Sequence, residues 1–66
     1  MEHELDQLNQ ANEQADLPWC YQIKRARGKR FRLVTTYRDG RIATSSPFTE
    51  AGMIRLLRLL TWEMTH

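Results

Sequence analysis

The fold is decided by residues 19–46, which read WCYQIKRARGKRFRLVTTYRDGRIATSS. Apolar and polar residues alternate through most of this stretch, and alternation with a period of two predicts half-buried strands. We expect three strands, over residues 19–24, 30–37 and 41–46. The inner face of the resulting sheet should carry Trp19, Tyr21, Ile23, Phe31, Leu33, Thr35, Tyr37, Ile42, Thr44 and Ser46.

The second turn of this sheet is expected at Asp39-Gly40. This pair predicts a two-residue type I′ turn, because both central positions of that turn need a positive φ. In the register that follows, Arg38 lies opposite Arg41, and the apolar residues of the two strands share one face.

The first turn is predicted to be a three-residue loop that ends at Gly28, since the third position of such a loop favours a left-handed glycine. The loop pairs Ile23 with Phe31 and Lys24 with Arg30. Both turns keep the apolar faces in phase, so the sequence predicts one antiparallel β-meander.

Helical patterns lie on either side of the meander. Residues 1–17 are an acidic helix or an acidic tail, ending before Pro18, with a thin stripe of Met1, Leu5, Leu8, Asn12 and Ala15. Residues 49–64 are an amphipathic helix with Thr49 as its N-cap and an apolar face of Met53, Leu56, Leu57, Leu60 and Met64. We therefore predict a single α+β domain, residues 1–66, whose C-terminal helix packs on the inner sheet face.

The small size of the chain bears on its assembly. A domain of 66 residues buries only ~60% of the surface of its unfolded chain. The C-terminal helix is apolar over more than one stripe, which leaves Ile54, Leu59 and Trp62 unassigned. We expect these three side chains to form a homodimer or partner interface, unless the N-terminal helix covers them in a monomer.

Residue types argue against several classes of site. A single cysteine, Cys20, excludes an intrachain disulfide, and with only His3 and His66 beside it there is no zinc ligand set, so no metal or cofactor is expected. Cys20 has no catalytic base in view, and we predict that the protein is not an enzyme. No signal peptide and no membrane span are recognisable, which indicates a cytoplasmic protein without membrane contact.

The strongest functional signal is the distribution of charge. The net charge is only +2, yet eight of the ten Lys and Arg residues lie between positions 24 and 41, with Asp39 as the sole acid among them. The predicted strands place five of these cations on the exposed sheet face as candidate nucleic-acid or anion contacts: Lys24, Arg30, Arg32, Arg38 and Arg41. Like charges directly opposed across strands are destabilising, which suggests that an anion neutralises them.

Three anions could do so. The first is nucleic acid, duplex DNA in particular, because arginine reads guanine edges and phosphates with its bidentate fork. The second is an acidic protein surface. The third is the chain's own acidic segment 1–16, folded over its own sheet or over that of a neighbouring copy.

The layout of residues 19–64, a basic three-stranded meander followed by one helix, resembles the arm-binding domains of phage integrases and the AP2-type plant DNA-binding domains. This resemblance implies DNA binding through the exposed sheet face. A small basic sheet behind an acidic segment also resembles the accessory proteins that phages and plasmids use against host machinery. The alternative function is therefore an inhibitor or adaptor that binds a host protein through the basic face or the apolar C-terminal helix.

Overall fold

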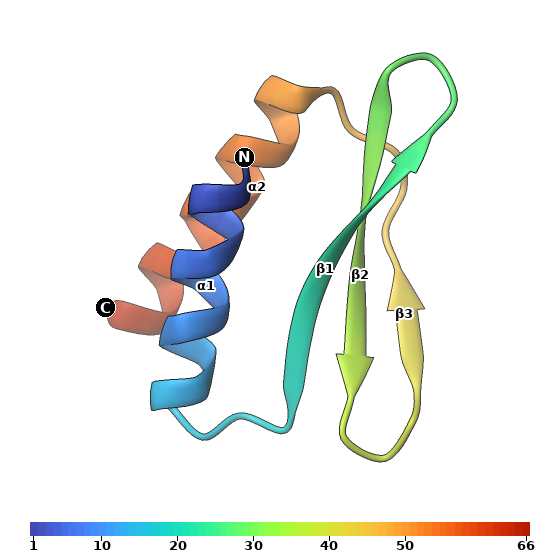
Figure 1. Cartoon of the computed structure of the whole chain (residues 1–66). Coiled ribbons are helices and arrows are strands. Elements are labelled where there is room, and N and C mark those ends of the chain that lie inside the picture. The colour runs from blue at the N-terminus through green and yellow to red at the C-terminus, as the bar shows by residue number, and fades with distance from the viewer.

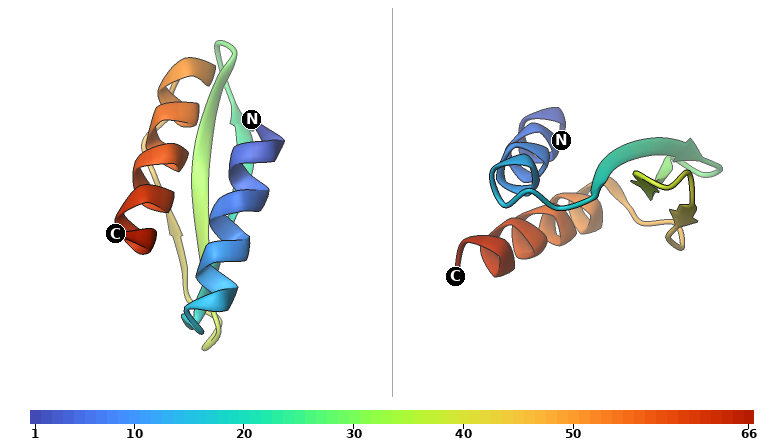
Figure 2. Two further views of the ribbon diagram at one scale, coloured as in Figure 1. Left: turned by 90° about the vertical axis from the view of Figure 1, so that its left-hand side faces the viewer. Right: turned by 90° about the horizontal axis from the view of Figure 1, so that it is seen from below.

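A three-stranded antiparallel sheet and two helices form the two layers of the protein, in a computed structural model that describes all 66 residues (Figure 1). The elements are α1 (Glu2–Gln14), β1 (Trp19–Ala26), β2 (Arg30–Tyr37), β3 (Ile42–Thr44) and α2 (Glu50–Thr65), and the strand order is β1-β2-β3. Both helices pack on one face of the sheet and leave the other uncovered (Figure 2). The predicted α+β fold is confirmed.

The core lies between the helices and the sheet. Its buried centre consists of Leu8 from α1, Leu33 from β2, and Met53 and Leu57 from α2. Because Leu8 is fully buried, the N-terminal segment is a packed helix and not a tail. The hydroxyl of Thr49 accepts a hydrogen bond from the N–H of Gly52 (3.1 Å), so the predicted N-cap of α2 is confirmed. Neither helix has the length and apolar content needed to cross a membrane.

Two asparagines of α1 close part of the free edge of β1. The amide of Asn9 pairs with Tyr21 as a neighbouring strand would, since its Nδ2 donates to the Tyr21 carbonyl (2.9 Å) and its Oδ1 accepts from the Tyr21 N–H (2.8 Å). Asn12 is buried and donates to the carbonyl of Trp19. An open edge strand invites unwanted pairing, and these amides occupy its first half. The polar Asn12 therefore stands in the apolar stripe of α1 because its side chain donates a hydrogen bond to the backbone of β1.

Glu4 ties α1 to both the N-terminus and α2. Its carboxylate lies 2.9 Å from the Met1 ammonium and 3.9 Å from the guanidinium of Arg58. The hydrogen bond from the ammonium is the main reason why the pKa of Glu4 lies below its ordinary value, and the charge of Arg58 adds to the effect.

The β1–β2 turn contains residues 27–29, one position later than predicted, because Ala26 still pairs with Arg30. The φ angle is positive at both Gly28 (70°) and Lys29 (56°). Two consecutive positive φ angles are typical of a type I′ turn. The β1–β2 turn therefore has the two positive φ angles that the sequence predicted for the β2–β3 turn.

The register of β1 on β2 differs from the prediction by two residues, which leaves the two faces unchanged. The observed pairs include Trp19–Tyr37, Tyr21–Thr35, Ile23–Leu33 and Lys24–Arg32. Lys24 thus lies opposite Arg32 and not opposite Arg30. The observed register brings the rings of Trp19 and Tyr37 to 6.1 Å, and such aromatic cross-strand pairs stabilise a sheet.

The β2–β3 turn is a three-residue loop, Arg38-Asp39-Gly40, and the predicted two-residue type I′ turn is wrong. The N–H of Tyr37 donates to the carbonyl of Arg41 (2.9 Å), and in this loop only Gly40 (φ 95°) has a positive φ. The carboxylate of Asp39 accepts from the N–H of Arg41 (3.0 Å), and this Asx turn holds the loop.

The added loop residue reverses the faces of β3, because side chains alternate along a strand. Ile42 lies opposite Thr36 and is 66% exposed on the face away from the helices, so its predicted inward position is wrong. Thr44 is turned outward with it. Arg41, predicted on the outer face, lies on the helix side with its guanidinium 4.8 Å from the centre of the Tyr37 ring.

A bulge after β3 returns the chain to the core. The N–H of Ser45 donates to the carbonyl of Leu33 (2.9 Å), whereas Phe48 and Phe31 exchange two hydrogen bonds of 2.7 and 2.8 Å. Phe31 lies two positions before Leu33 in β2, whereas Phe48 lies three positions after Ser45, so the second segment has one extra residue, which is a β-bulge. Pro47, which has no N–H to donate, lies in the bulged segment. Phe48 packs against the core, so the alternation seen in β3 does not continue through this bulge.

Candidate functional site

The outer face of the sheet is the surface that the helices leave open. It is formed by Cys20, Gln22, Lys24, Arg30, Arg32, Val34, Thr36, Ile42 and Thr44. Its charged side chains gather towards the β1–β2 turn, and its uncharged ones towards the opposite end of the sheet. We call residues 24–32, which contain this turn, the basic hairpin.

The basic hairpin holds six cations in nine positions and no acid. Lys24, Arg30 and Arg32 project from its outer face, and Arg27 and Lys29 lie in its loop. None of these cations takes part in an ion pair within 4.0 Å. The hairpin is therefore a concentration of positive charge without internal compensation.

Lys24 and Arg32 face each other directly across β1 and β2. Compared with an attractive pair, such a contact forgoes up to ~1 kcal/mol. Arg32 is half-buried, and its Nη1 donates to the carbonyl of Ser45 (3.0 Å). This bond fixes the guanidinium over the outer face and leaves its other N–H groups available to an acceptor on a ligand.

Lys29 is held in a left-handed conformation (φ 56°), which costs a non-glycine residue about 1–2 kcal/mol. It is exposed in the loop and makes no ion pair. Glycine or asparagine would be more stable in this backbone. Backbone strain of this kind is concentrated at functional sites, so Lys29 is a candidate contact residue.

The other two predicted site residues are separated from this cluster. Arg38 lies at the far end of β2, 4.0 Å from Asp16. Arg41 is on the helix side and is bound by Asp39 at 2.8 Å. The expected contact of Arg38 with Arg41 is not formed. Of the five predicted residues, the structure brings together three.

Sequence reasoning missed the loop cations Arg27 and Lys29, because it considered only strand positions. The signal that could have found them is the density of basic residues from 24 to 32, six in nine positions without an acid. The sixth cation, Arg25, is different. It lies opposite Phe31 on the helix side, where Glu2 and Glu50 line the same hollow of 410 Å³. Glu50 also lines a hollow of 400 Å³ with Arg25, Lys29 and Arg30.

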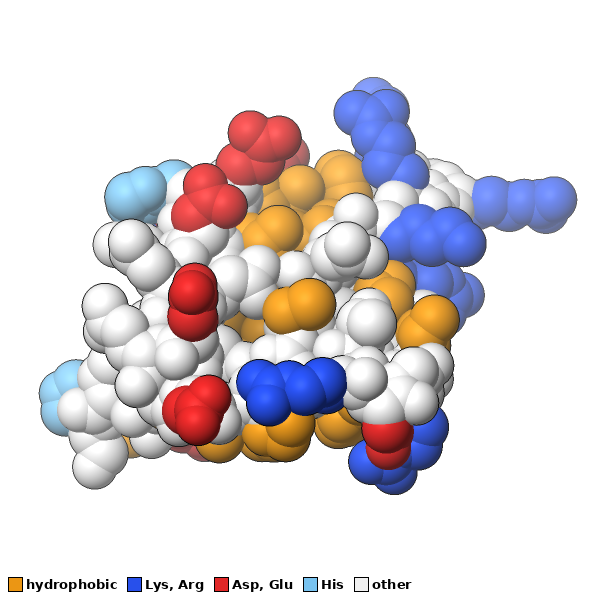
Figure 3. All heavy atoms as spheres, turned by 60° about the horizontal axis from the view of Figure 1, so that its bottom comes forward, with side chains coloured by type: hydrophobic (Ala, Val, Ile, Leu, Met, Phe, Trp, Pro, Cys, Tyr) orange, Lys and Arg blue, Asp and Glu red, His pale blue; other side chains and the backbone are white.

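Most acidic and most basic side chains lie on different parts of the molecule. Figure 3 shows acidic side chains over the helices and most Lys and Arg side chains over the sheet. α1 packs on the face opposite to Lys24 and Arg32, and its following residue Asp16 reaches only Arg38. The acidic segment therefore does not cover the outer face of the basic hairpin of its own chain.

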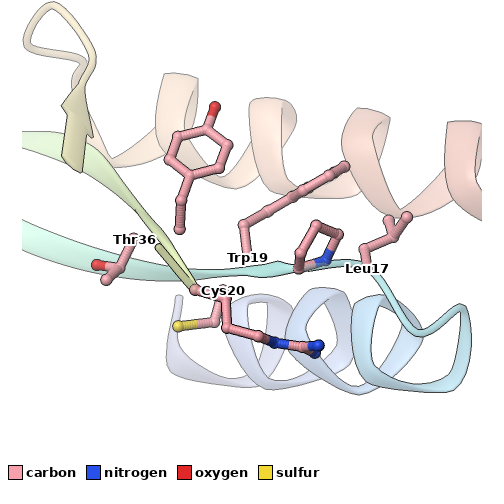
Figure 4. A pocket seen from close by; sticks show the side chains of 7 residues that line it. Leu17, Trp19, Cys20 and Thr36 are labelled. Carbon is pink, nitrogen blue, oxygen red and sulfur yellow. The ribbon is translucent and has the colours of Figure 1, made fainter. Parts of the chain in front are cut away.

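Cys20 lies beside a hollow of 280 Å³ at the other end of the sheet, which also contains Leu17 and Trp19. Figure 4 shows that Trp19 and Cys20 leave β1 in opposite directions. The residues that line this hollow include no histidine. No three His, Cys, Asp or Glu side chains are grouped closely enough to hold a metal ion.

The three residues predicted to form an interface on α2 do not lie together. Leu59 (52% exposed) and Trp62 (58%) project into solvent. Ile54 is half-buried, and Arg58, one turn later, reaches Glu4 of α1, so Ile54 lies on the flank that faces α1. α1 thus covers this flank and leaves Leu59 open. Trp62 borders a hollow of 270 Å³ that also contains Glu4 and Gln7 of α1.

Comparisons with protein-family models, with curated proteins and with solved structures gave no match. The resemblance in layout to two DNA-binding families therefore stays a prediction.

Proposed function

We propose that this protein is a non-enzymatic binding module for nucleic acid, duplex DNA in particular, and that the basic hairpin is its contact surface. The observation that carries this proposal is a group of five cations, on the outer face and in the loop of the hairpin, that make no ion pair: Lys24, Arg27, Lys29, Arg30 and Arg32. A polyanion that neutralises them releases its condensed counterions, and this release drives binding.

The position of the aromatic rings favours a duplex over a single strand. Proteins that bind single strands stack the bases on exposed aromatic side chains. Here Trp19, Tyr21, Phe31 and Tyr37 are half-buried on the helix side, away from Lys24 and Arg30. A two-stranded ribbon with arginines also suits the major groove of B-DNA, which is about 12 Å wide.

An acidic protein surface is the second candidate, and Ile42 is the observation that favours it. This isoleucine is 66% exposed on the outer face, which also carries the half-buried Val34 and the exposed Cys20. A partner with an apolar patch beside acidic residues would match both halves of that face. A phage- or plasmid-type inhibitor or adaptor of a host protein would act in this way.

A binding titration with a random-sequence duplex tests the proposal. Fluorescence anisotropy at about 50 and about 200 mM salt should give an affinity that falls by roughly two orders of magnitude, as four or five phosphate contacts require. A single strand of the same length should bind more weakly. Absence of duplex binding at the lower salt concentration would remove nucleic acid from consideration and leave the acidic protein surface.

A further inference from the structure

The solvent side of α2 carries an apolar pair without a partner, Leu59 and Trp62. The two are three residues apart and therefore neighbours on one helical face. They remain 52% and 58% exposed, although the ring of His66 stacks on Trp62 at 4.8 Å. Exposed apolar side chains of this size on a small domain indicate a contact surface.

Two charged residues lie at equal distances before and after Leu59. Arg55 lies four residues before Leu59, and Glu63 lies four residues after it. Both are exposed, and neither takes part in an ion pair within the chain. They are about 12 Å apart along the helix axis, too far to pair with each other. Each therefore lacks a partner of opposite sign.

We infer that this face binds the same face of a second copy, with the two α2 helices antiparallel and a two-fold axis beside Leu59. Such an axis places residues at equal distances before and after it at the same level. Arg55 then meets the partner's Glu63 and the partner's Trp62, and the same contacts recur on the other side of the axis. An ion pair and a cation–π contact form twice, around a central pair of leucines.

The charge pattern is what selects a second copy as the occupant. A partner of one sign would satisfy Arg55 or Glu63 but would repel the other. An inverted copy of the same helix satisfies both. The basic hairpins do not oppose this association, because in each chain the core and the sheet lie on the other side of α2.

Dimerisation does not depend on the proposed function. If the basic hairpin binds nucleic acid, as proposed, dimerisation has a further consequence. Its layers would be sheet, helices, helices and sheet, so the two outer faces point in opposite directions. The two basic hairpins would then contact two separate nucleic-acid segments and hold them together.

Sedimentation of the full chain over tens to hundreds of micromolar tests the interface. The wild-type mass should rise from 7.9 kDa towards twice that value. Arg55→Glu and Glu63→Arg should each weaken association by about tenfold or more, because like charges then meet across the axis. An equal mixture of the two variants should regain most of the wild-type association, since the mixed dimer has both ion pairs and one of the two cation–π contacts. This rescue separates a lost interface from a lost fold.

Two further variants complete the experiment. Arg27→Glu makes the same change of charge in the basic hairpin and should leave the mass unchanged. Leu59→Glu places two carboxylates on the axis and should give a monomer with the helical circular dichroism of the wild type. A wild-type mass of 7.9 kDa at the highest concentration, or a mixture that stays monomeric, would overturn the inference. Dimerisation of Arg55→Glu as strong as that of the wild type would overturn it as well.

Discussion

The two hairpins of the sheet turn through loops of equal length but differ in backbone and in charge. The φ angle is positive at Gly28 and Lys29 in the first loop and only at Gly40 in the second. In the second hairpin, Arg41 is bound by Asp39 at 2.8 Å. In the first, no cation has an acidic partner within 4.0 Å.

The difference teaches that an arginine in a hairpin can serve either the fold or a ligand, and that its surroundings decide which. Arg41 has an acid two residues away and an aromatic ring beneath it, so its bonding capacity is used within the domain. Lys24 and Arg30 have neither, and their mutual repulsion with Arg32 lowers stability until an anion arrives.

The largest effect should come from removing two cations from each hairpin in turn. Lys24→Gln with Arg30→Gln should lower duplex affinity by about a hundredfold at about 50 mM salt, and should reduce the salt slope by about two units. Arg38→Gln with Arg41→Gln removes the same charge and should cost less than about tenfold. Anisotropy titrations measure both. Equal losses of duplex affinity in the two double variants would mean that net charge alone governs binding. The two hairpins would then not differ in function.

Glycine replacement in the turns should have the next largest effect. Gly40→Val places a β-branched residue at a φ of 95° and should destabilise the domain by more than ~1 kcal/mol. Gly28→Val, at a φ of 70°, should do the same. Thermal unfolding followed by circular dichroism should show a fall of about 4–8 °C for each kcal/mol. Arg38→Val is the control, since Arg38 has no positive φ. An unchanged melting temperature for Gly40→Val would contradict the β2–β3 hairpin.

The helices and the first two strands were predictable because their signals are local. Exposure alternates regularly from Trp19 to Lys24 in β1, and polar and apolar residues alternate from Arg30 to Leu33 in β2. The N-cap Thr49 comes shortly before the apolar face of α2. Strand parity in β2 is fixed by burial of Leu33 in the core. Because side chains alternate along the strand, Arg30 and Arg32 were correctly predicted on the outer face. The predicted register of β1 on β2 nevertheless differed from the observed one by two residues.

The orientation of β3 could not be obtained in this way. It depends on the carboxylate of Asp39, which accepts from the N–H of Arg41, and on the bulge that brings Phe48 opposite Phe31. The bulge requires a partner seventeen residues away in the sequence, which no local pattern contains. The Asx turn is local, but the Asp39-Gly40 pair also favours the two-residue turn that was predicted. A one-residue difference in register then moved Ile42 and Arg41 to the faces opposite to those predicted.

Lys29→Gly sharpens the comparison, because it separates strain from charge. Glycine adopts a φ of 56° without a steric penalty, so stability should rise by up to about 1 kcal/mol. Duplex affinity should still fall severalfold, with a salt slope smaller by about one unit. Arg27→Gly removes the same charge from the same loop where φ is not positive, and it should weaken binding without stabilising the domain. If Lys29→Gly bound duplex as the wild type does, Lys29 would have no part in the site.

The smallest effect is expected from Asp39→Asn. Asparagine keeps an acceptor for the N–H of Arg41, so the Asx turn survives, but the charge that binds the guanidinium at 2.8 Å is lost. An exposed ion pair contributes about 0–1 kcal/mol, and the loss of stability should stay in that range. The freed Arg41 still lies on the helix side beside Tyr37, away from the basic hairpin. Duplex affinity should therefore rise by no more than about twofold in the anisotropy titration. A tenfold rise in duplex affinity would mean that the ion pair with Asp39, and not the position of Arg41, prevents the second hairpin from binding the duplex.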